Sequence, residues 1–265
     1  MKRIVAMLVV CVSVMTGSAA KEMPIYSVET PVRAVALTFN AAYSDAGVAD
    51  ILATLERRGI TASFFLCGQF VNNHPGLVKQ IFAAGHDVGN HGDTHAHVAS
   101  LSLAQNKKEI GDMHKKVNDL LGFSMTFFRP PYGEYNNTVM AAAKDLGYTS
   151  IQWDVDSLDW KKDLSAWQVI SRVLDNKKLR NGSIVLFHTD GQHTPAVLDK
   201  IIDGLIGKGF QFMPVSELVH KNGYYLDIEG RQRLNEKDVS KEKPPQRQAA
   251  ARFRGMVRRR TGASG

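Results

Sequence analysis

The chain has few cysteines and no long apolar run. Cysteine occurs only at Cys11, inside a short N-terminal apolar stretch, and at Cys67. If that stretch is removed, one cysteine remains, and a single cysteine excludes an internal disulfide as the source of stability. Cys67 follows the apolar residues 64–66, which favours a buried, unreactive thiol over a nucleophile. We therefore expect the fold to be stabilised by an apolar core.

The most continuous apolar stretch is short and lies at the N-terminus. Residues 4–14 follow a basic start, and small residues at 18–20 provide a cleavage point. This arrangement is typical of a signal peptide, and the stretch is too short for a stable membrane span. We predict a signal peptide over residues 1–20, cleaved after Ala20, and export to the periplasm or the extracellular space. An uncleaved membrane tether is the alternative.

Most of the chain also lacks a net charge. The whole chain carries +7, and residues 221–265 hold twelve Lys/Arg against five Asp/Glu, also +7, so residues 1–220 sum to zero. Residues 221–265 lack sustained apolar periodicity, which predicts a basic, disordered tail. Two interpretations of this tail stay open, adhesion to an anionic wall or membrane surface and a solvated extension without a partner. We predict no nucleic-acid partner.

Short apolar runs alternate with amphipathic segments across residues 32–220, which we predict to be one domain after a linker at 21–31. The predicted strands are 35–39, 62–66, 86–89, 125–128, 149–153, 184–187 and 210–213. The predicted helices, several begun by proline or ended by glycine, are 48–58, 75–84, 103–121, 137–146, 166–176 and 195–206.

The predicted strands are continuously apolar, which favours a parallel sheet covered by helices. Seven strands fit either an open doubly wound sheet or a barrel, and active sites of both lie at the carboxyl ends of the strands. Polar clusters follow five strand ends, at 40–45, 90–95, 129–133, 154–160 and 188–190. Five clusters on one rim suit a barrel better than a single crevice. We predict an α/β fold, a distorted (β/α) barrel of about seven parallel strands.

A histidine pair is the clearest chemical pattern. His91 and His95 are four residues apart, and this spacing places two side chains on one face of a helical turn. Neutral imidazoles are good ligands for Zn²⁺ and other transition ions. We predict a divalent-metal site here, with His97 as a bystander or a residue on the substrate side.

Two further clusters carry opposite charges. Arg129 leaves an apolar strand and precedes two prolines and a glycine, so a rigid loop would fix its guanidinium. Three acids follow the strand at 149–153, namely Asp154, Asp156 and Asp159, and bidentate pairing with Arg129 is a natural role for one of them. The alternatives are a solvated arginine in a surface turn and helix capping by Asp156 or Ser157.

His188 ends the apolar strand at 184–187. A lone histidine at such a position is often a satisfied core residue. Beside metal ligands and an arginine–aspartate pair, a general acid is the better interpretation.

These clusters together resemble the NodB-homology polysaccharide deacetylases, carbohydrate esterase family four. Four family motifs stand in order, HxxxH at 91–95, RPPYG at 129–133, DxxDW at 156–160 and LxH at 186–188. The resemblance runs from about Val32 to Leu218. It implies a NodB-like distorted barrel, a divalent metal, usually zinc, and removal of N-acetyl or O-acetyl groups from a carbohydrate.

The resemblance also implies roles for individual residues. His91 and His95 would hold the metal, which would polarise the acetyl carbonyl and activate a water molecule. Arg129 and Asp159 would form an ion pair around the catalytic base. His188 would protonate the leaving amine or alcohol.

The substrate side would be formed by three other motif residues. Tyr132 lies where the family uses a backbone amide as an oxyanion donor, and Trp160 and Leu186 would wall the acetyl pocket. We therefore predict a metal-dependent hydrolase of carbon–nitrogen bonds. Its predicted substrate is an exported carbohydrate such as peptidoglycan or chitin-like oligomers.

The first family motif lacks its carboxylates. The family usually has TFDDG, with one aspartate as base and the next as metal ligand, whereas Asn40 and Ala41 stand at these positions. An amide cannot accept a proton at neutral pH, although its oxygen can bind a metal or a water. With Tyr43 and Asp45, the stretch resembles the spore-type and delta-lactam deacetylase branch.

Three consequences of the missing carboxylates stay open. Asp45 serves as ligand or base, or a water held by Asn40 and the histidine pair supports slow hydrolysis, or the chain binds glycan without cutting it. Loss of a general base typically removes about 10²–10⁴-fold of rate, which leaves some activity. We favour hydrolysis, and a catalytically impaired glycan-binding homologue is the alternative.

Overall fold

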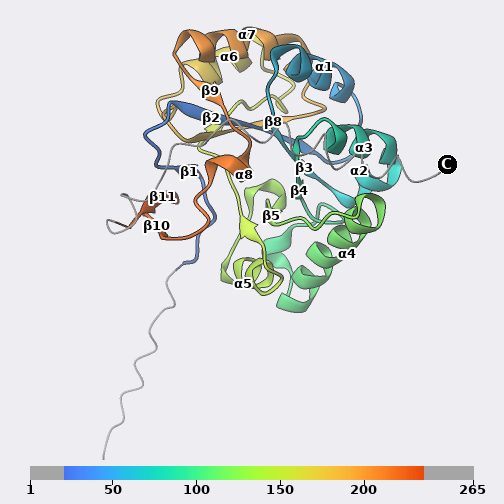
Figure 1. Cartoon of the computed structure of the whole chain (residues 1–265). Coiled ribbons are helices and arrows are strands. Elements are labelled where there is room, and N and C mark those ends of the chain that lie inside the picture. Colours follow the sequence, from blue (N-terminus) through green and yellow to red (C-terminus); the bar gives the residue numbers. More distant parts are fainter. Residues whose placement is uncertain (1–20, 236–265) are drawn as a thin grey trace, which may run out of the picture.

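One curled sheet organises residues 21–235, the part of the chain that the computed structural model describes (Figure 1). Its strand order is β10-β11-β1-β8-β2-β3-β4-β5-β6, with β7 beside β8 and β9 beside β2. Neighbours from β8 through β2 to β6 are parallel. The predicted signal peptide and the predicted tail beyond residue 235 lie outside the described residues.

The sheet is built from short strands. Their bounds are β1 Ser27–Val28, β2 Ala34–Ala41, β3 Ser63–Leu66, β4 Asp87–Asn90, β5 Phe127–Phe128, β6 Thr149–Ser150, β7 Val155–Asp156, β8 Ser183–His188, β9 Gln211–Phe212, β10 Tyr224–Leu226 and β11 Arg231–Leu234.

Most of the helices cover the outer face of this sheet (Figure 1). Their bounds are α1 Val48–Arg58, α2 Gly68–Asn73, α3 Pro75–Ala83, α4 Leu103–Leu121, α5 Asn137–Asp145, α6 Ala166–Leu174, α7 Thr194–Gly207 and α8 Val215–Leu218, with short 3₁₀ turns at Val98–Ser100 and Pro131–Gly133. The predicted fold class is confirmed, because the parallel strands curl strongly into a half-barrel.

Local sequence explains where these helices begin and end. Helix α4 starts at a capping box in which Ser102 and Gln105 exchange hydrogen bonds between side chain and backbone. Helix α1 ends at Gly59, whose φ of 62° is the left-handed conformation that favours glycine. The six predicted helices are all present within one or two residues of the predicted bounds.

Apolar residues cover both faces of β2, which explains the continuous apolar run. Val35, Leu37 and Phe39 pack in the core under the helices, together with Ala41. Ala34 and Ala36 pack in a second core inside the curl of the sheet. Since side chains alternate along a strand, residue 40 follows the inner series and residue 41 the outer series.

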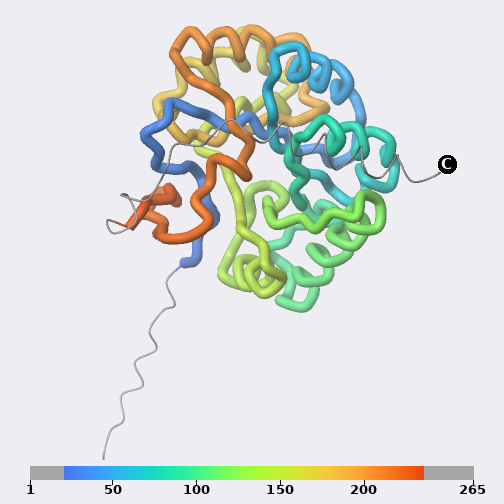
Figure 2. The backbone as a smooth tube through the Cα atoms, viewed as in Figure 1, coloured from blue at the N-terminus to red at the C-terminus, as the bar shows by residue number. Residues whose placement is uncertain are grey.

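Both ends of the described chain join the sheet, which corrects two predictions. Residues 21–31 are not a linker, because Ile25 bridges to Ile151 and β1 pairs with β8 and β11. Residues 221–235 are not a disordered tail, because β10 and β11 form a hairpin that continues the sheet. Figure 2 shows the N-terminal segment beside the C-terminal one, although more than two hundred residues separate Ser27 from its partner Arg231.

No helix within residues 21–235 is long and apolar enough to cross a membrane.

Candidate active site

Polar side chains gather at the carboxyl ends of four strands of the parallel sheet. Asn40 lies at the end of β2, His91 follows β4, Arg129 follows β5, and His188 ends β8. Backbone pairing fixes the register, with Asn40 opposite His188 and Asn90 opposite Phe128. The predicted rim therefore forms, because parallel strands present their carboxyl ends on the same side.

The histidine pair lies on a loop and not on a helical turn. His91 and His95 follow β4, and Gly92 (φ 78°) and His95 (φ 58°) adopt left-handed conformations that bend the chain. The Glu109 carboxylate of α4 accepts hydrogen bonds from Thr94 and fixes this bend. The two imidazole centroids are 4.9 Å apart. The spacing therefore predicted correctly that the two histidine rings lie close together. The prediction that they lie on a helical turn is wrong.

Both imidazoles are held in the neutral form. His91 is fully buried, its Nδ1 lies 2.7 Å from the Arg129 carbonyl oxygen, and an N–H donated there leaves the Nε2 lone pair free. Burial lowers the pKa of His91 well below its usual value. Burial likewise lowers the pKa of His95 to about 4, and its buried Nδ1 has no hydrogen-bond partner. Neutral imidazoles with free nitrogens fit two ligand positions of a transition-metal ion.

A third protein ligand is not found beside this pair. Within residues 21–235, no group of three or more His, Cys, Asp and Glu side chains is arranged to hold a metal. The Asp45 carboxylate lies 3.7 Å from His74 Nδ1, and the side chain is 59% exposed. This position does not support the alternative in which Asp45 replaces the missing carboxylate of the first motif.

Asn40 binds the buried guanidinium of Arg129. Arg129 Nη1 donates to Asn40 Oδ1 at 3.0 Å, and Nη2 donates to the Gln152 carbonyl oxygen at 3.2 Å. The guanidinium lies over the Phe65 ring, 4.0 Å from its centroid. Burial lowers the pKa of Arg129 to about 9. The oxygen of Asn40 therefore faces the cation, and an amide accepts no proton from a substrate water.

His188 pairs with Asp159, which corrects the predicted partner of that acid. The Asp159 carboxylate is fully buried and accepts from His188 Nδ1 at 2.8 Å, from the His188 backbone N–H at 2.7 Å and from the Thr194 hydroxyl at 2.6 Å. The expected Arg129–Asp159 ion pair does not form, because Arg129 binds Asn40 and Gln152 instead. With Nδ1 bound to the carboxylate, His188 has its Nε2 free for a substrate.

Aromatic side chains form the rim of the site. His95 lies between Tyr132 and Tyr43, at 4.5 and 5.6 Å between ring centroids, and both tyrosines are about half exposed. His97 stacks on Tyr132 with centroids 4.3 Å apart. Trp160 is 55% exposed. The sequence motifs identified Tyr132 and Trp160 as site residues. They did not predict the contact between Tyr43 and His95, because no spacing in the sequence indicates that contact.

The other predicted side chains are buried. Leu186 is 2% exposed. Asp156 binds the Trp153 indole N–H at 3.1 Å and the Leu158 backbone N–H at 2.8 Å, so it stabilises its own loop. Cys67 is buried, and burial raises the pKa of its thiol to about 11, as expected for an unreactive cysteine.

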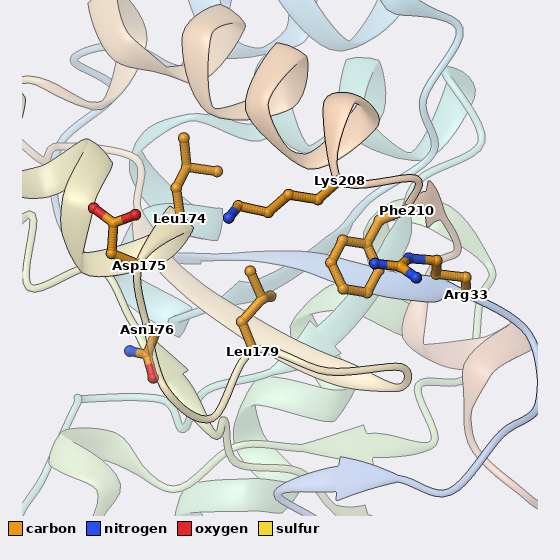
Figure 3. Close-up of a pocket in the computed structure, with 7 residues that line it drawn as sticks. All are labelled: Arg33, Leu174, Asp175, Asn176, Leu179, Lys208 and Phe210. Carbon is orange, nitrogen blue, oxygen red and sulfur yellow. The ribbon is translucent and has the colours of Figure 1, made fainter.

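A separate cavity of about 500 Å³ lies at the opposite ends of the strands (Figure 3). Arg33 precedes β2, Leu179 precedes β8 and Phe210 precedes β9, so these lining residues mark the amino ends of the strands. Arg33 stacks on Phe210, and Lys208 borders the same space. This cavity is therefore not part of the candidate site.

The curled parallel sheet and its histidine-rich carboxyl rim define an α/β protein of the NodB-like class. A family model described as polysaccharide deacetylase matches residues 27–151. The peptidoglycan-N-acetylglucosamine deacetylase of Bacillus cereus is 34% identical over 188 residues, which cover 69% of this chain and 67% of that protein. The chain belongs to the polysaccharide deacetylase family, which confirms the resemblance to that family; the resemblance to its spore-type and delta-lactam branch stays a prediction.

Other relatives differ in length or in activity. The chain is 36% identical to the peptidoglycan-N-acetylglucosamine deacetylase PgdA of Listeria monocytogenes over 69% of its own length, but spans only 38% of that protein. A solved pseudoenzyme of carbohydrate esterase family four from Bacillus anthracis has a TM-score of 0.71 at 29% identity, covering 75% of this chain and 69% of that one. A mutant of that pseudoenzyme, described as having restored enzymatic activity, has the same TM-score, 0.71.

Proposed function

We propose that this protein removes N-acetyl groups from an exported carbohydrate, of the kind found in peptidoglycan or chitin-like oligomers. The observation that carries this proposal is the Asp159–His188 pair, at 2.8 Å, on the same rim as the neutral His91 and His95. After burial, the electrostatic effect of His188 also lowers the pKa of both His91 and His95. This effect supports a shared reaction centre. An acid and a metal-type ligand pair are the parts that hydrolysis of an amide needs.

His91 and His95 would hold a divalent metal, and Zn²⁺ is our proposal because both ligands are neutral imidazoles. When bound, such an ion supplies polarisation of the acetyl carbonyl. The protein's own contribution is to keep both rings unprotonated, through burial and through the Arg129 carbonyl that accepts from His91 Nδ1. The missing third ligand predicts weaker metal retention than in relatives with a complete set.

Proton transfer to the leaving amine is the role we assign to His188. Its Nδ1 stays hydrogen-bonded to Asp159, so a proton on Nε2 points to the substrate side. The Asp159 carboxylate stabilises the imidazolium and fixes the ring. The Tyr132 ring contacts His95, and the backbone amide of Tyr132 would donate to the oxygen of the attacked carbonyl.

Deprotonation of the attacking water is the weak step in this site. Asn40 occupies the position of the family's base, and its oxygen accepts from Arg129. An amide in this state takes up no proton. We therefore propose slow hydrolysis, reduced about 10²–10⁴-fold relative to a site with a positioned base.

A glycan-binding protein without turnover is the second candidate. It is favoured by the exposed rings of Tyr43 and Tyr132 beside His95, since aromatic rings at a surface present apolar faces to a ligand. The outward position of Asp45 and the similarity to a solved pseudoenzyme point the same way. This candidate predicts saturable binding of N-acetylglucosamine oligomers with no acetate released.

Acetate release decides between the two candidates. The full chain is incubated with a panel of N-acetylated glycans, with and without added Zn²⁺ or Co²⁺, and His91→Ala serves as the matched control. Hydrolysis predicts metal-dependent release that His91→Ala lacks. Absence of release with either ion from every glycan, together with retained binding, would leave the second candidate.

We also propose that the protein acts outside the cytoplasm and that its basic C-terminal segment contacts an anionic wall or membrane surface. The charge excess of residues 221–265 supports this contact. Deleting residues from 238 onward should weaken salt-sensitive retention on anionic vesicles or cell wall, with the acetate-releasing activity unchanged. Equal retention of both forms at low salt would contradict it.

A further inference from the structure

Arg129 is a buried cation whose hydrogen-bond acceptors are neutral. Its side chain is 0% exposed, and its two bonded nitrogens donate to the Asn40 amide oxygen and the Gln152 carbonyl oxygen. Neither acceptor carries a charge that offsets the guanidinium. A buried charge without a counterion is strongly unfavourable, so this arrangement calls for an anion.

The acid that acts electrostatically on Arg129 does not form that counterion. The Asp156 carboxylate favours the charged form of Arg129 at a distance, but in the described part of the chain it forms no ion pair with it. Its oxygens accept from the Trp153 indole and from the Leu158 backbone. The aromatic faces of Phe65 and Trp153, 4.0 and 5.5 Å from the guanidinium carbon, stabilise the cation only in part.

Two buried N–H donors at this cation and its partner have no acceptor. Arg129 Nε and Gln152 Nε2 are buried atoms without a hydrogen-bond partner in the described residues. Gln152 also binds the guanidinium through its backbone carbonyl oxygen. Unsatisfied buried donors are rare in native proteins, and two beside one uncompensated cation indicate a missing acceptor group.

We propose that Arg129 and Gln152, beside Asn40, form a site for a small monovalent anion, either chloride or a short carboxylate such as formate. The negative charge that the chain lacks at position 40 is then supplied from solution. Asn40 keeps 5% of its surface exposed, which gives the site contact with solvent. Anion binding at this site needs neither a bound metal nor turnover, so it can be tested independently of the proposed hydrolysis.

The test is the melting temperature of the full chain, treated with EDTA, in increasing sodium formate or sodium chloride. Ionic strength is held constant with sodium HEPES, whose anion is too large for the site. At ten times Kd, bound anion raises Tm by about 3–6 °C. Separate titrations show which of the two anions saturates the site.

Two variants make the result specific. Asn40→Asp supplies an internal carboxylate beside Arg129, so its Tm no longer responds to formate or chloride. Lys208→Ala removes an exposed cation at the cavity in Figure 3 and keeps the wild-type response. An equal response in wild type and Asn40→Asp overturns the proposal, and so does the absence of any saturable response in wild type.

A spectroscopic measurement covers the case in which Asn40→Asp fails to fold. The ¹⁵N-edited NMR signal of the Arg129 Nε–H in the wild-type chain should shift with added formate or chloride and saturate with the same Kd as the Tm response. A signal that stays fixed while Tm rises assigns the anion effect to another place and refutes the site.

Discussion

Replacing Asp159 with asparagine tests whether the Asp159 carboxylate acts in catalysis, through His188, or only stabilises the fold. The Asp159 carboxylate accepts three hydrogen bonds, two of them from His188 and one from the Thr194 hydroxyl. Asparagine keeps one acceptor oxygen and places an N–H₂ group where the other oxygen was. The substitution thus removes the negative charge that stabilises the His188 imidazolium and fixes its ring.

The expected effects on rate and stability are both large enough to measure. Loss of an oriented acid lowers kcat by about 10²–10⁴-fold. KM changes little, because Asp159 is fully buried and does not reach a substrate. The mismatch of donors costs about 2 kcal/mol of the free energy of unfolding, which lowers Tm by about 4–8 °C.

The assay measures kcat and KM for acetate release from N-acetylglucosamine oligomers, alongside thermal melting. Thr194→Val is the matched control, since it removes another hydrogen bond to the same carboxylate and leaves the His188 contact intact. We expect it to lower Tm while kcat falls less than about tenfold. If the wild-type rate is too slow to resolve, the comparison is made in an Asn40→Asp background.

A particular result would refute this account of the pair. If Asp159→Asn lowers Tm but leaves kcat within about threefold of its starting value, then His188 is not the proton donor that we assign. The carboxylate would then be a structural group that secures the loop after β7 to α7.

Two further predictions concern the first motif and the response to acid. Asn40→Asp restores a carboxylate beside Arg129 and should raise the rate of acetate release by about 10²–10⁴-fold; an unchanged rate would show that Ala41, not Asn40, limits the site. Burial lowers the pKa of His86 to about 4, and its Nδ1 accepts from the Ala62 backbone N–H. Its contribution, about 3 kcal/mol, is therefore complete above pH 6.5 and lost as the pH falls from 6.5 towards 4. Denaturant unfolding should show this loss, and His86→Asn should flatten it; an equal slope in both proteins would contradict it.

The apolar runs predicted the central sheet because parallel strands are buried on both faces. All seven predicted strands are present, and β2 shows why, with one apolar core on each side. Strands β1, β7, β10 and β11 were missed. They have two to four residues each, and the pairing of β1 with β11 joins segments at opposite ends of the described chain, which no local pattern reveals.

In the candidate site too, local motifs predicted which residues take part, but not which distant residues they contact. Motif spacing identified His91, His95 and His188, since each follows a predicted strand end. Opposite charge suggested pairing Arg129 with one of three acids, and the family resemblance implied Asp159. The sheet places Arg129 against Asn40 and leaves Asp159 to His188. The partner of a charged side chain depends on strand order and curl, and neither can be obtained from charge alone.

The most direct test of the central claim is acetate release from purified peptidoglycan by the wild-type chain with Zn²⁺, measured against His188→Ala under the same conditions. Hydrolysis on this rim predicts slow, metal-dependent release by the wild type and at least tenfold less by His188→Ala. No release by the wild type, or equal release by both proteins, would contradict it.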